Sequence, residues 1–348
     1  MKNTSLFFTL LLGVLIFHSC KTEPTETPVL KTDIQEFLGQ WTIDIEGGSV
    51  GWLEVRQEEN YLDADVLWGG GSVVPVSNVF LARNQVLIVQ RTNPNVIRKR
   101  DENNNPVRTH MVTSWLEIIK DGDNIDGILL SPRSSGLGVD TTTFTGVNLP
   151  PVPPAPDLTS LKFGEPVTLF NGNDLTGWKL INENQTNGFK VVNGLLVNEP
   201  VQPEGVERVR YGNLRTEQEF EDFNLKIEVN IPAGSNSGVY LRGMYEIQVM
   251  DSYKRELDPH NMGAVFSRIK PTVAAEKPAG EWQTLDITLC ERHITVILNG
   301  IKIIDNQPVY GPTGGAMKSD VFAPGPIYLQ GDHGKVSYRN ILLTPIVK

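Results

Sequence analysis

Residues 225–231 read Leu-Lys-Ile-Glu-Val-Asn-Ile, an alternation of apolar and polar side chains. Successive side chains of a β-strand point to opposite faces, so the four apolar residues would face a core and the three polar ones would face outward. The same period recurs at residues 239–242, 245–249, 285–289 and 294–298. Asn299-Gly300 then carries the signal of a type I′ hairpin turn. This half of the chain is predicted to be a two-sheet sandwich with an outer concave face free to bind.

A proline-rich segment separates this half from the preceding one. Residues 150–156 read Pro-Pro-Val-Pro-Pro-Ala-Pro, with five prolines in seven positions. Proline removes a backbone donor and favours an extended polyproline conformation, so the segment cannot lie inside a strand or helix. We therefore predict a linker at 149–161, a first domain at 33–148 and a second domain at 162–348.

The first domain shows short alternating runs separated by turn residues. A short helical segment precedes Leu38-Gly-Gln-Trp41, and about eight strands follow. This order resembles the small lipocalin-like antiparallel β-barrel, which can hold one small ligand or be filled by its own side chains. Four tryptophans would either line a sugar-stacking pocket or pack in the core, and core packing is favoured because aromatic residues dominate cores. They are Trp41, Trp52, Trp68 and Trp115.

The first twenty residues resemble a lipoprotein signal peptide. Lys2 supplies a positive start, and the apolar run at 6–17 is shorter than the ~20 residues that a membrane-crossing helix needs. Residues 15–20 resemble a lipobox, so Cys20 is predicted to be acylated; an ordinary cleaved signal with an incidental cysteine is the alternative. The Pro, Thr and Glu composition of 21–32 predicts a flexible tether. The protein is expected to be exported to the cell envelope and anchored there by lipid, at the outer membrane or the periplasmic face.

Charge and cysteine content exclude several other classes. The formal net charge is −10, with no basic stripe that would displace counterions from nucleic acid. The only other cysteine is Cys290, among strand-like residues, so we expect no disulfide and interpret Cys290 as a buried, inert thiol. The five histidines are too scattered for a zinc site, and no cofactor motif is evident, although a divalent cation stays possible.

One candidate polar patch follows from the period of two. Tyr240 and Arg242 would share one face of their strand, and Glu246 and Gln248 one face of the next. If the two strands are neighbours, these side chains form a single patch, with Asp251 at the strand end. A solvated outer sheet with an incidental ion pair explains the same pattern.

A second cluster lies near the C-terminus. Gln330 would oppose core-facing Leu329, and Gly331 and Gly334 bracket Asp332-His333. Glycine permits a close approach of the backbone, and histidine is the side chain best suited to proton transfer near neutrality. The bracket would therefore present a carboxylate and an imidazole at a strand end, in either a catalytic or a purely structural role.

Several motifs in the second domain occur together and in order. They are Phe163 to Trp178, Asn193-Gly-Leu-Leu, Asn236-Ser-Gly-Val-Tyr-Leu-Arg-Gly, Tyr245-Glu-Ile-Gln, Gly280-Glu-Trp, Leu298-Asn-Gly, Gln330-Gly-Asp-His and Tyr338-Arg-Asn-Ile. Together they resemble the 3-keto-disaccharide hydrolase domain family over residues 162–346. The resemblance implies a concanavalin-like or LamG-like jelly-roll. It also implies a substrate class, glycosides that are already oxidised to a ketone at C3.

The implied chemistry defines roles for the candidate residues. A C3 ketone acidifies the C2 proton, so a base can remove it, the C1 substituent can leave and water can add back. Glu246 and His333 would supply base and acid in an undetermined order, with Asp332 orienting His333. Residues expected to bind the enolate or the sugar are Arg242, Gln248, Tyr240, Gln330, Asp251 and Trp282. Glu246 with Asp251 or Asp332 could also form the carboxylate pair of an ordinary glycosidase.

Three functions remain open at this point, and in the third the N-terminal barrel carries a ligand while the jelly-roll serves mainly as a scaffold. The first is a cell-envelope enzyme that cleaves 3-keto-glycosides, by elimination and hydration or by net hydrolysis, and works beside a sugar 3-oxidoreductase. The second is a surface carbohydrate-binding lipoprotein without catalysis, whose concave sheet stacks sugars on Tyr240 and Trp282.

Overall fold

The computed structural model describes residues 34–82 and 85–347. The signal peptide, the acylation of Cys20 and the tether at 21–32 lie outside these ranges and stay predictions. Within the described ranges, no helix is long and apolar enough to span a membrane.

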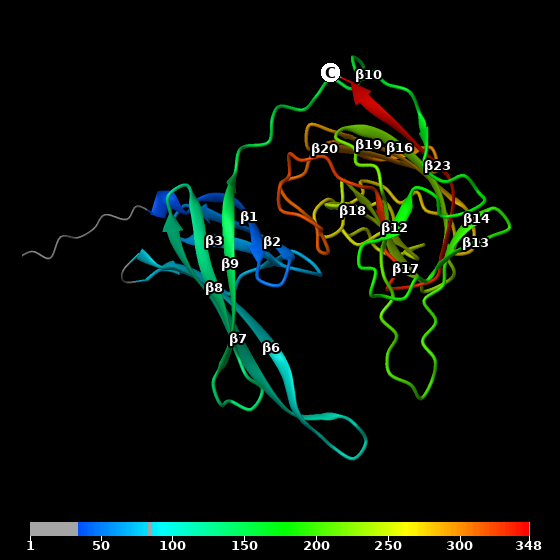
Figure 1. Cartoon of the computed structure of the whole chain (residues 1–348). Helices are drawn as coiled ribbons and strands as arrows, with labels where there is room; N and C mark the ends of the chain where they lie inside the picture. The colour runs from blue at the N-terminus through cyan, green and yellow to red at the C-terminus, as the bar shows by residue number, and fades with distance from the viewer. Residues whose placement is uncertain (1–33, 83–84, 348) are drawn as a thin grey trace, which may run out of the picture. The chain divides into compact units, whose positions relative to one another are not determined.

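The first half forms one antiparallel sheet, drawn from blue to green in Figure 1. A 3-10 turn, η1 (Ile34–Glu36), precedes it. The strand order is β4-β3-β2-β1-β9-β8-β7-β6-β5. The strands are β1 (Gly39–Ile45), β2 (Ser49–Gln57), β3 (Leu62–Trp68), β4 (Val74–Pro75), β5 (Asn78–Leu81), β6 (Leu87–Arg100), β7 (Pro106–Asp121), β8 (Asn124–Pro132) and β9 (Val139–Leu149).

The two ends of this order are joined by the chain itself. β4 pairs with β3, β5 pairs with β6, and the two short strands are halves of one segment. Between them, the Val76 amide donates to the Ala64 carbonyl and the Ser77 amide to the Gln90 carbonyl. The sheet therefore closes on itself into the small barrel that the sequence predicts. Its interior is filled by apolar side chains, among them the fully buried Trp41.

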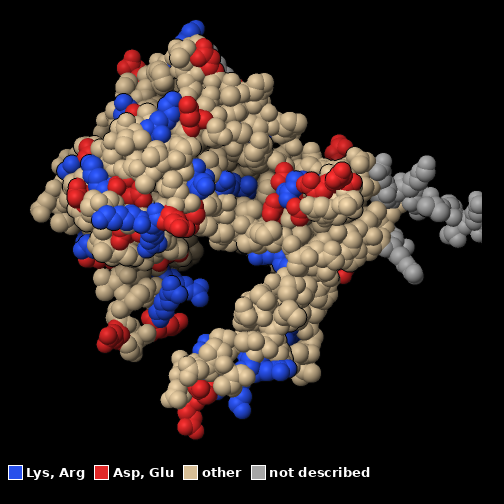
Figure 2. Space-filling view, turned by 180° about the vertical axis from the view of Figure 1, so that it is seen from behind, with Lys and Arg blue, Asp and Glu red and all other residues tan. Residues whose placement is uncertain are grey.

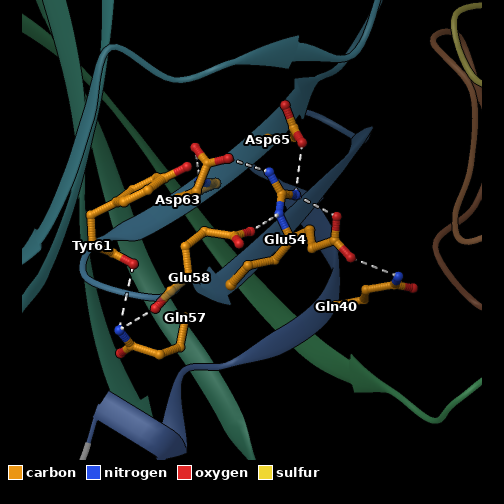
Figure 3. Close-up of polar contacts among 9 residues, drawn as sticks. Gln40, Glu54, Gln57, Glu58, Tyr61, Asp63 and Asp65 are labelled. Atoms are coloured by element: carbon orange, nitrogen blue, oxygen red, sulfur yellow. Dashed lines mark hydrogen bonds and ion pairs between the residues drawn. The ribbon is translucent and has the colours of Figure 1, made fainter.

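Charged side chains on β2 and β3 are gathered around one arginine (Figure 3). The Arg56 guanidinium lies 2.6 Å from Glu54, 2.7 Å from both Asp63 and Asp65, and 3.6 Å from Glu58. Partial burial lowers the pKa of Arg56, but the hydrogen bonds to the carboxylates outweigh it and raise that pKa. Four acidic side chains, three on adjacent strands and Glu58 just after β2, thus share one cation, which offsets their mutual repulsion.

The second half contains two sheets, coloured green to red in Figure 1. The larger has the order β13-β14-β23-β16-β19-β20-β21, with β10 and β11 also pairing with β23, and the smaller has the order β12-β15-β22-β17-β18. Their strands are β10 (Lys162–Phe163), β11 (Val167–Thr168), β12 (Trp178–Leu180), β13 (Phe189–Val192), β14 (Leu195–Asn198), β15 (Leu214–Thr216), β16 (Phe223–Asn230), β17 (Asn236–Leu241), β18 (Tyr245–Met250), β19 (Gln283–Cys290), β20 (His293–Leu298), β21 (Ile301–Pro308), β22 (Tyr328–Leu329) and β23 (Val336–Val347).

The predicted alternation holds in β16. Leu225, Ile227 and Val229 are buried in the core between the sheets, while Lys226 is exposed. Cys290 is buried at the end of β19, as expected. Asn299 and Gly300 both have positive φ, 52° and 82°, and join β20 to β21 in the predicted type I′ hairpin. The all-β jelly-roll sandwich is therefore confirmed.

Two further features agree with what the sequence predicts. Residues 150–157 form neither strand nor helix, as the prolines require. On the face seen in Figure 2, acidic and basic side chains are interspersed rather than separated into fields of one sign. On this face, the negative charge is dispersed.

Candidate active site

The strand register places most of the predicted residues on one face of the smaller sheet. β17 lies between β18 and β22, with Tyr240 opposite both Glu246 and Tyr328, and Gly238 opposite Gln248. Directly opposed residues of a β-ladder point to the same side. Because Val239 and Ile247 belong to the core between the sheets, Tyr240, Glu246 and Gln248 lie on the outer face. β17 and β18 are therefore neighbours, which is the condition on which the polar patch depended.

This outer face is covered, which differs from the free concave surface that we expected. Tyr240, Glu246 and Gln248 are only 1%, 4% and 2% exposed. The segment 313–317 lies against them, because the Thr313 hydroxyl accepts a hydrogen bond from the Glu246 amide and the Gly314 carbonyl lies 2.7 Å from the Tyr240 hydroxyl. Period two gives the face of a side chain, but it cannot reveal a loop some seventy residues away that packs on that face.

Glu246 is the buried carboxyl group of the site. Its Oε2 lies 2.7 Å from the Tyr240 hydroxyl. Burial raises the pKa of Glu246 to about 7, against smaller opposite effects of Tyr240 and His333. A methyl group on Gly238 would lie 2.3 Å from Glu246 Oε1. Glycine at 238 therefore makes room for the carboxyl group, which reaches from β18 over Gly238 of β17.

Tyr328 was not singled out from the sequence, yet it completes this group. Its ring stacks on that of Tyr240, with centroids 3.8 Å apart and planes 14° apart. Its hydroxyl donates to the Gly315 carbonyl over 2.7 Å. Burial, and then the nearby acidic groups, raise the pKa values of both tyrosines, so both hydroxyls keep their hydrogens. The sequence signal was its place two residues before Gln330, on the same face.

The turn after β22 brings Asp332 and His333 to the end of this sheet. His333 Nδ1 lies 2.7 Å from Asp332 Oδ1, and both side chains are about half-exposed. This hydrogen bond raises the pKa of His333, and His333 in turn lowers the pKa of Asp332 against the effect of burial. Because Nδ1 is engaged, Nε2 is the nitrogen left for proton exchange. His333 is also close enough to Glu246 for its charge to lower the pKa of that group.

Side-chain amide groups hold the turn in place. The Asn198 side chain, fully buried at the end of β14, donates to the carbonyls of both Gly331 and Gly334, over 3.0 and 3.1 Å. Asn213 accepts from the Gly331 amide over 2.8 Å. Sequence reasoning missed both asparagines. No local pattern marks them, since their partners lie more than a hundred residues further along the chain.

The same end of the sheet carries two buried acceptors without a hydrogen-bond partner in the described part of the chain. They are Gln330 Oε1 and Asn236 Oδ1. Gln330 itself is fixed by its backbone, whose amide donates to the Gly238 carbonyl and whose carbonyl accepts from Ser237 Oγ. A buried polar atom that lacks a partner is costly, so both oxygens are suited to receive hydroxyl groups of a ligand.

Arg242 does not join the patch. The chain turns at Arg242-Gly243, with φ values of 54° and 66°, so the alternation of β17 ends at Leu241. The Arg242 guanidinium donates instead to the carbonyls of Val321 and Ala323, both over 2.9 Å, and lies 4.0 Å from Asp222. The expected patch of Arg242, Glu246 and Gln248 is therefore divided, because the residue two positions after Tyr240 has already left the sheet.

Trp282 and Asp251 also lie apart from Glu246. The Arg339 guanidinium lies 4.0 Å above the Trp282 ring and is bonded to Glu228 of β16, so Trp282 belongs with the larger sheet. Asp251 Oδ2 accepts from the Gly234 amide over 2.9 Å and so fixes the loop before β17. The structure thus brings together Glu246, Tyr240, Gln248, Gln330, Asp332 and His333.

No group of three or more histidine, cysteine or acidic side chains suited to a metal ion occurs among the described residues. The site contains three carboxyl or imidazole groups, the buried Glu246 and the half-exposed pair of Asp332 and His333. A carboxyl and an imidazole whose pKa values are both raised can act as a proton donor and a proton acceptor in one reaction.

Several solved structures are similar to part of this chain. Two candidate glycosyl hydrolases of Parabacteroides distasonis are similar in structure. The first has 27% sequence identity to this chain, and the match covers 56% of this chain and 92% of the other, with a TM-score of 0.42. The second has 22% sequence identity, and the match covers 52% of this chain and 94% of the other, with a TM-score of 0.41. SCLam, an endo-β-1,3(4)-glucanase of family GH16, has 12% identity, covers 56% and 92%, and has a TM-score of 0.34.

No curated protein matches the sequence. The model of one domain family does match, over residues 165–344, just over half of the chain. This range contains the whole smaller sheet and every residue of the site described above. The chain therefore belongs to the family of 3-keto-α-glucoside-1,2-lyase-like domains.

Proposed function

We propose that the protein cleaves 3-keto-glycosides at C1, by removal of the C2 proton, departure of the C1 substituent and addition of water. The observation that carries the proposal is the presence of a buried carboxyl, Glu246, whose pKa is raised to about 7, on the same sheet as His333, which lies on the turn after β22. One group takes the C2 proton and the other protonates the leaving oxygen.

The neighbouring amides supply the remaining roles. Gln248 Oε1 is engaged by the Val249 amide over 3.0 Å, so the NH₂ end of Gln248 is the end suited to stabilising a developing enolate. The unpartnered oxygens of Gln330 and Asn236 would receive sugar hydroxyls. Asp332 holds the imidazole of His333 in one orientation, which leaves Nε2 for the substrate.

Turnover of a 3-keto-disaccharide by residues 21–348 tests the proposal directly. We expect release of the 3-keto sugar by the wild type and a loss of at least 10²-fold in Glu246→Gln and in His333→Ala, the size typical of a lost acid or base. Trp282→Ala is the control, since Trp282 lies on the other sheet. Binding without turnover by the wild type would instead support a carbohydrate-binding protein, and full activity in both site variants would disprove the residue assignment.

We also propose that this chemistry takes place in the cell envelope, with Cys20 as the lipid anchor and a sugar 3-oxidoreductase as the source of substrate. The support is the lipobox-like sequence at 15–20 and the requirement for a substrate that already carries a ketone. Incorporation of a labelled fatty acid by the full chain, abolished in Cys20→Ala, tests the anchor. Labelling that persists in Cys20→Ala would rule it out.

A further inference from the structure

Besides the Tyr328 hydroxyl, two oxygen neighbours lie close to the Tyr240 hydroxyl, which has a single hydrogen to share between them. Its oxygen lies 2.7 Å from Glu246 Oε2 and 2.7 Å from the Gly314 carbonyl oxygen. The hydrogen of the stacked Tyr328 cannot serve either contact, because it is donated to the Gly315 carbonyl. If Glu246 were ionised, both neighbours of the Tyr240 hydroxyl would be acceptors, and one of these two short contacts would hold no hydrogen.

A second hydrogen is therefore needed for these two contacts, and a protonated Glu246 carboxyl would supply it. The Glu246 carboxyl then donates to the Tyr240 oxygen, and Tyr240 donates to the Gly314 carbonyl. The surroundings favour this neutral form, since Glu246 is 4% exposed and no cation lies within ion-pair distance of it among the described residues. Burial without a cation disfavours a carboxylate, which agrees with the raised pKa of this group.

We propose that Glu246 rests in its protonated form and is the general acid of the site, with Tyr240 as the residue that positions its proton and His333 as the base. The proposal rests on the function proposed above and fixes the order of the two roles. His333 fits the base, because Asp332 engages Nδ1 and leaves the lone pair of neutral Nε2 for the C2 proton.

The steps balance in protons and electrons. His333 Nε2 takes the C2 proton, and the electrons of the C2–H bond form the enolate of the C3 ketone. The enolate then forms the C1–C2 double bond as the C1–O bond breaks, and the leaving oxygen takes the proton of Glu246. Water adds its oxygen to C1, returns a proton to Glu246, and C2 recovers a proton from His333. While Glu246 is a carboxylate, the Tyr240 hydrogen turns from Gly314 to Glu246.

An infrared difference spectrum tests the resting protonation without turnover. In wild type minus Glu246→Gln at pH 6, we expect the carbonyl band of a neutral carboxylic acid. We expect that band to move to higher wavenumber in Tyr240→Phe, where the carboxyl O–H loses its acceptor. Tyr338→Phe is the matched control, since it removes another buried hydroxyl whose partner is Ser237, and the band should not move. Absence of the band from folded wild type at pH 6 would overturn the proposal.

The leaving group then separates acid from base. The nitrophenolate group of a nitrophenyl 3-keto-glucoside can depart without being protonated, whereas the methoxy group of a methyl 3-keto-glucoside needs an acid to protonate its oxygen. We expect the turnover of Glu246→Gln to fall 10²-fold or more on the methyl glycoside but less than 10-fold on the nitrophenyl glycoside. The turnover of His333→Ala should fall by the same factor on both glycosides. An equal loss on both glycosides in Glu246→Gln would make it the base and refute the assignment. If wild type turns over neither glycoside, the proposed function fails, and the infrared band still decides the protonation of Glu246.

Discussion

The buried carboxyl of Glu246 should make the stability of the protein depend on pH in a defined direction. The pKa of this group is about 7 in the folded protein, against 4.5 as its ordinary value. Between these values the unfolded chain has released the proton that the folded protein still holds, so stability falls as pH rises from 4.5 through 7. The difference between the two pKa values corresponds to a loss of about 3 kcal/mol once pH is well above 7.

The variant Glu246→Gln lacks this titration but keeps the size of the side chain. Its free energy of unfolding, relative to wild type, should therefore rise by about 3 kcal/mol between pH 4.5 and pH 8.5. Guanidinium unfolding followed by circular dichroism at the two pH values measures this change. The comparison of variants within each pH cancels the contribution of other groups, among them His333, whose raised pKa also lowers stability as pH increases.

A second carboxyl gives a control of opposite sign. Glu199 is bonded to Lys190 and Lys335, which hold its pKa at about 2. Its stabilising contribution is present above pH 4.5 and is lost as pH falls toward 2, so Glu199→Gln should cost stability at pH 8.5.

If the difference in free energy of unfolding between wild type and Glu246→Gln is the same at pH 4.5 and pH 8.5, the raised pKa of Glu246 is wrong.

Three further substitutions test the geometry. Gly238→Ala should fold, because the atoms nearest to the new methyl group belong to the Glu246 side chain (Oε1 at 2.3 Å) and not to the backbone, but the displaced carboxyl should lower turnover at least 10-fold; wild-type turnover would contradict the contact. Asn198→Ala should speed hydrogen exchange at 331–334 and raise KM, and unchanged exchange would refute its anchoring role. Arg56→Met should lower the melting temperature at low salt and less so at high salt, where repulsion among the acidic side chains is screened; an equal loss at both salt concentrations would argue against charge repulsion.

Much of the fold could be predicted because the signals are local. The alternation at 225–231, the turn residues Asn299-Gly300 and the prolines at 150–156 each act over a few residues, where backbone geometry alone decides. The same alternation of side chains along a strand correctly placed Tyr240, Glu246 and Gln248 on one face of the sheet. It failed at Arg242, because a left-handed turn of two residues ends the strand there and period two no longer applies.

The sequence by itself thus determined the strands, the family and the face on which Glu246 lies. Only the tertiary structure decided what surrounds that face. Segment 313–317 covers Glu246, Tyr328 stacks on Tyr240, and Asn198 fixes the turn that carries His333. These contacts join residues far apart in the chain, which no local pattern encodes. They also remove water from Glu246, and it is this desolvation, rather than any neighbouring residue in sequence, that raises its pKa.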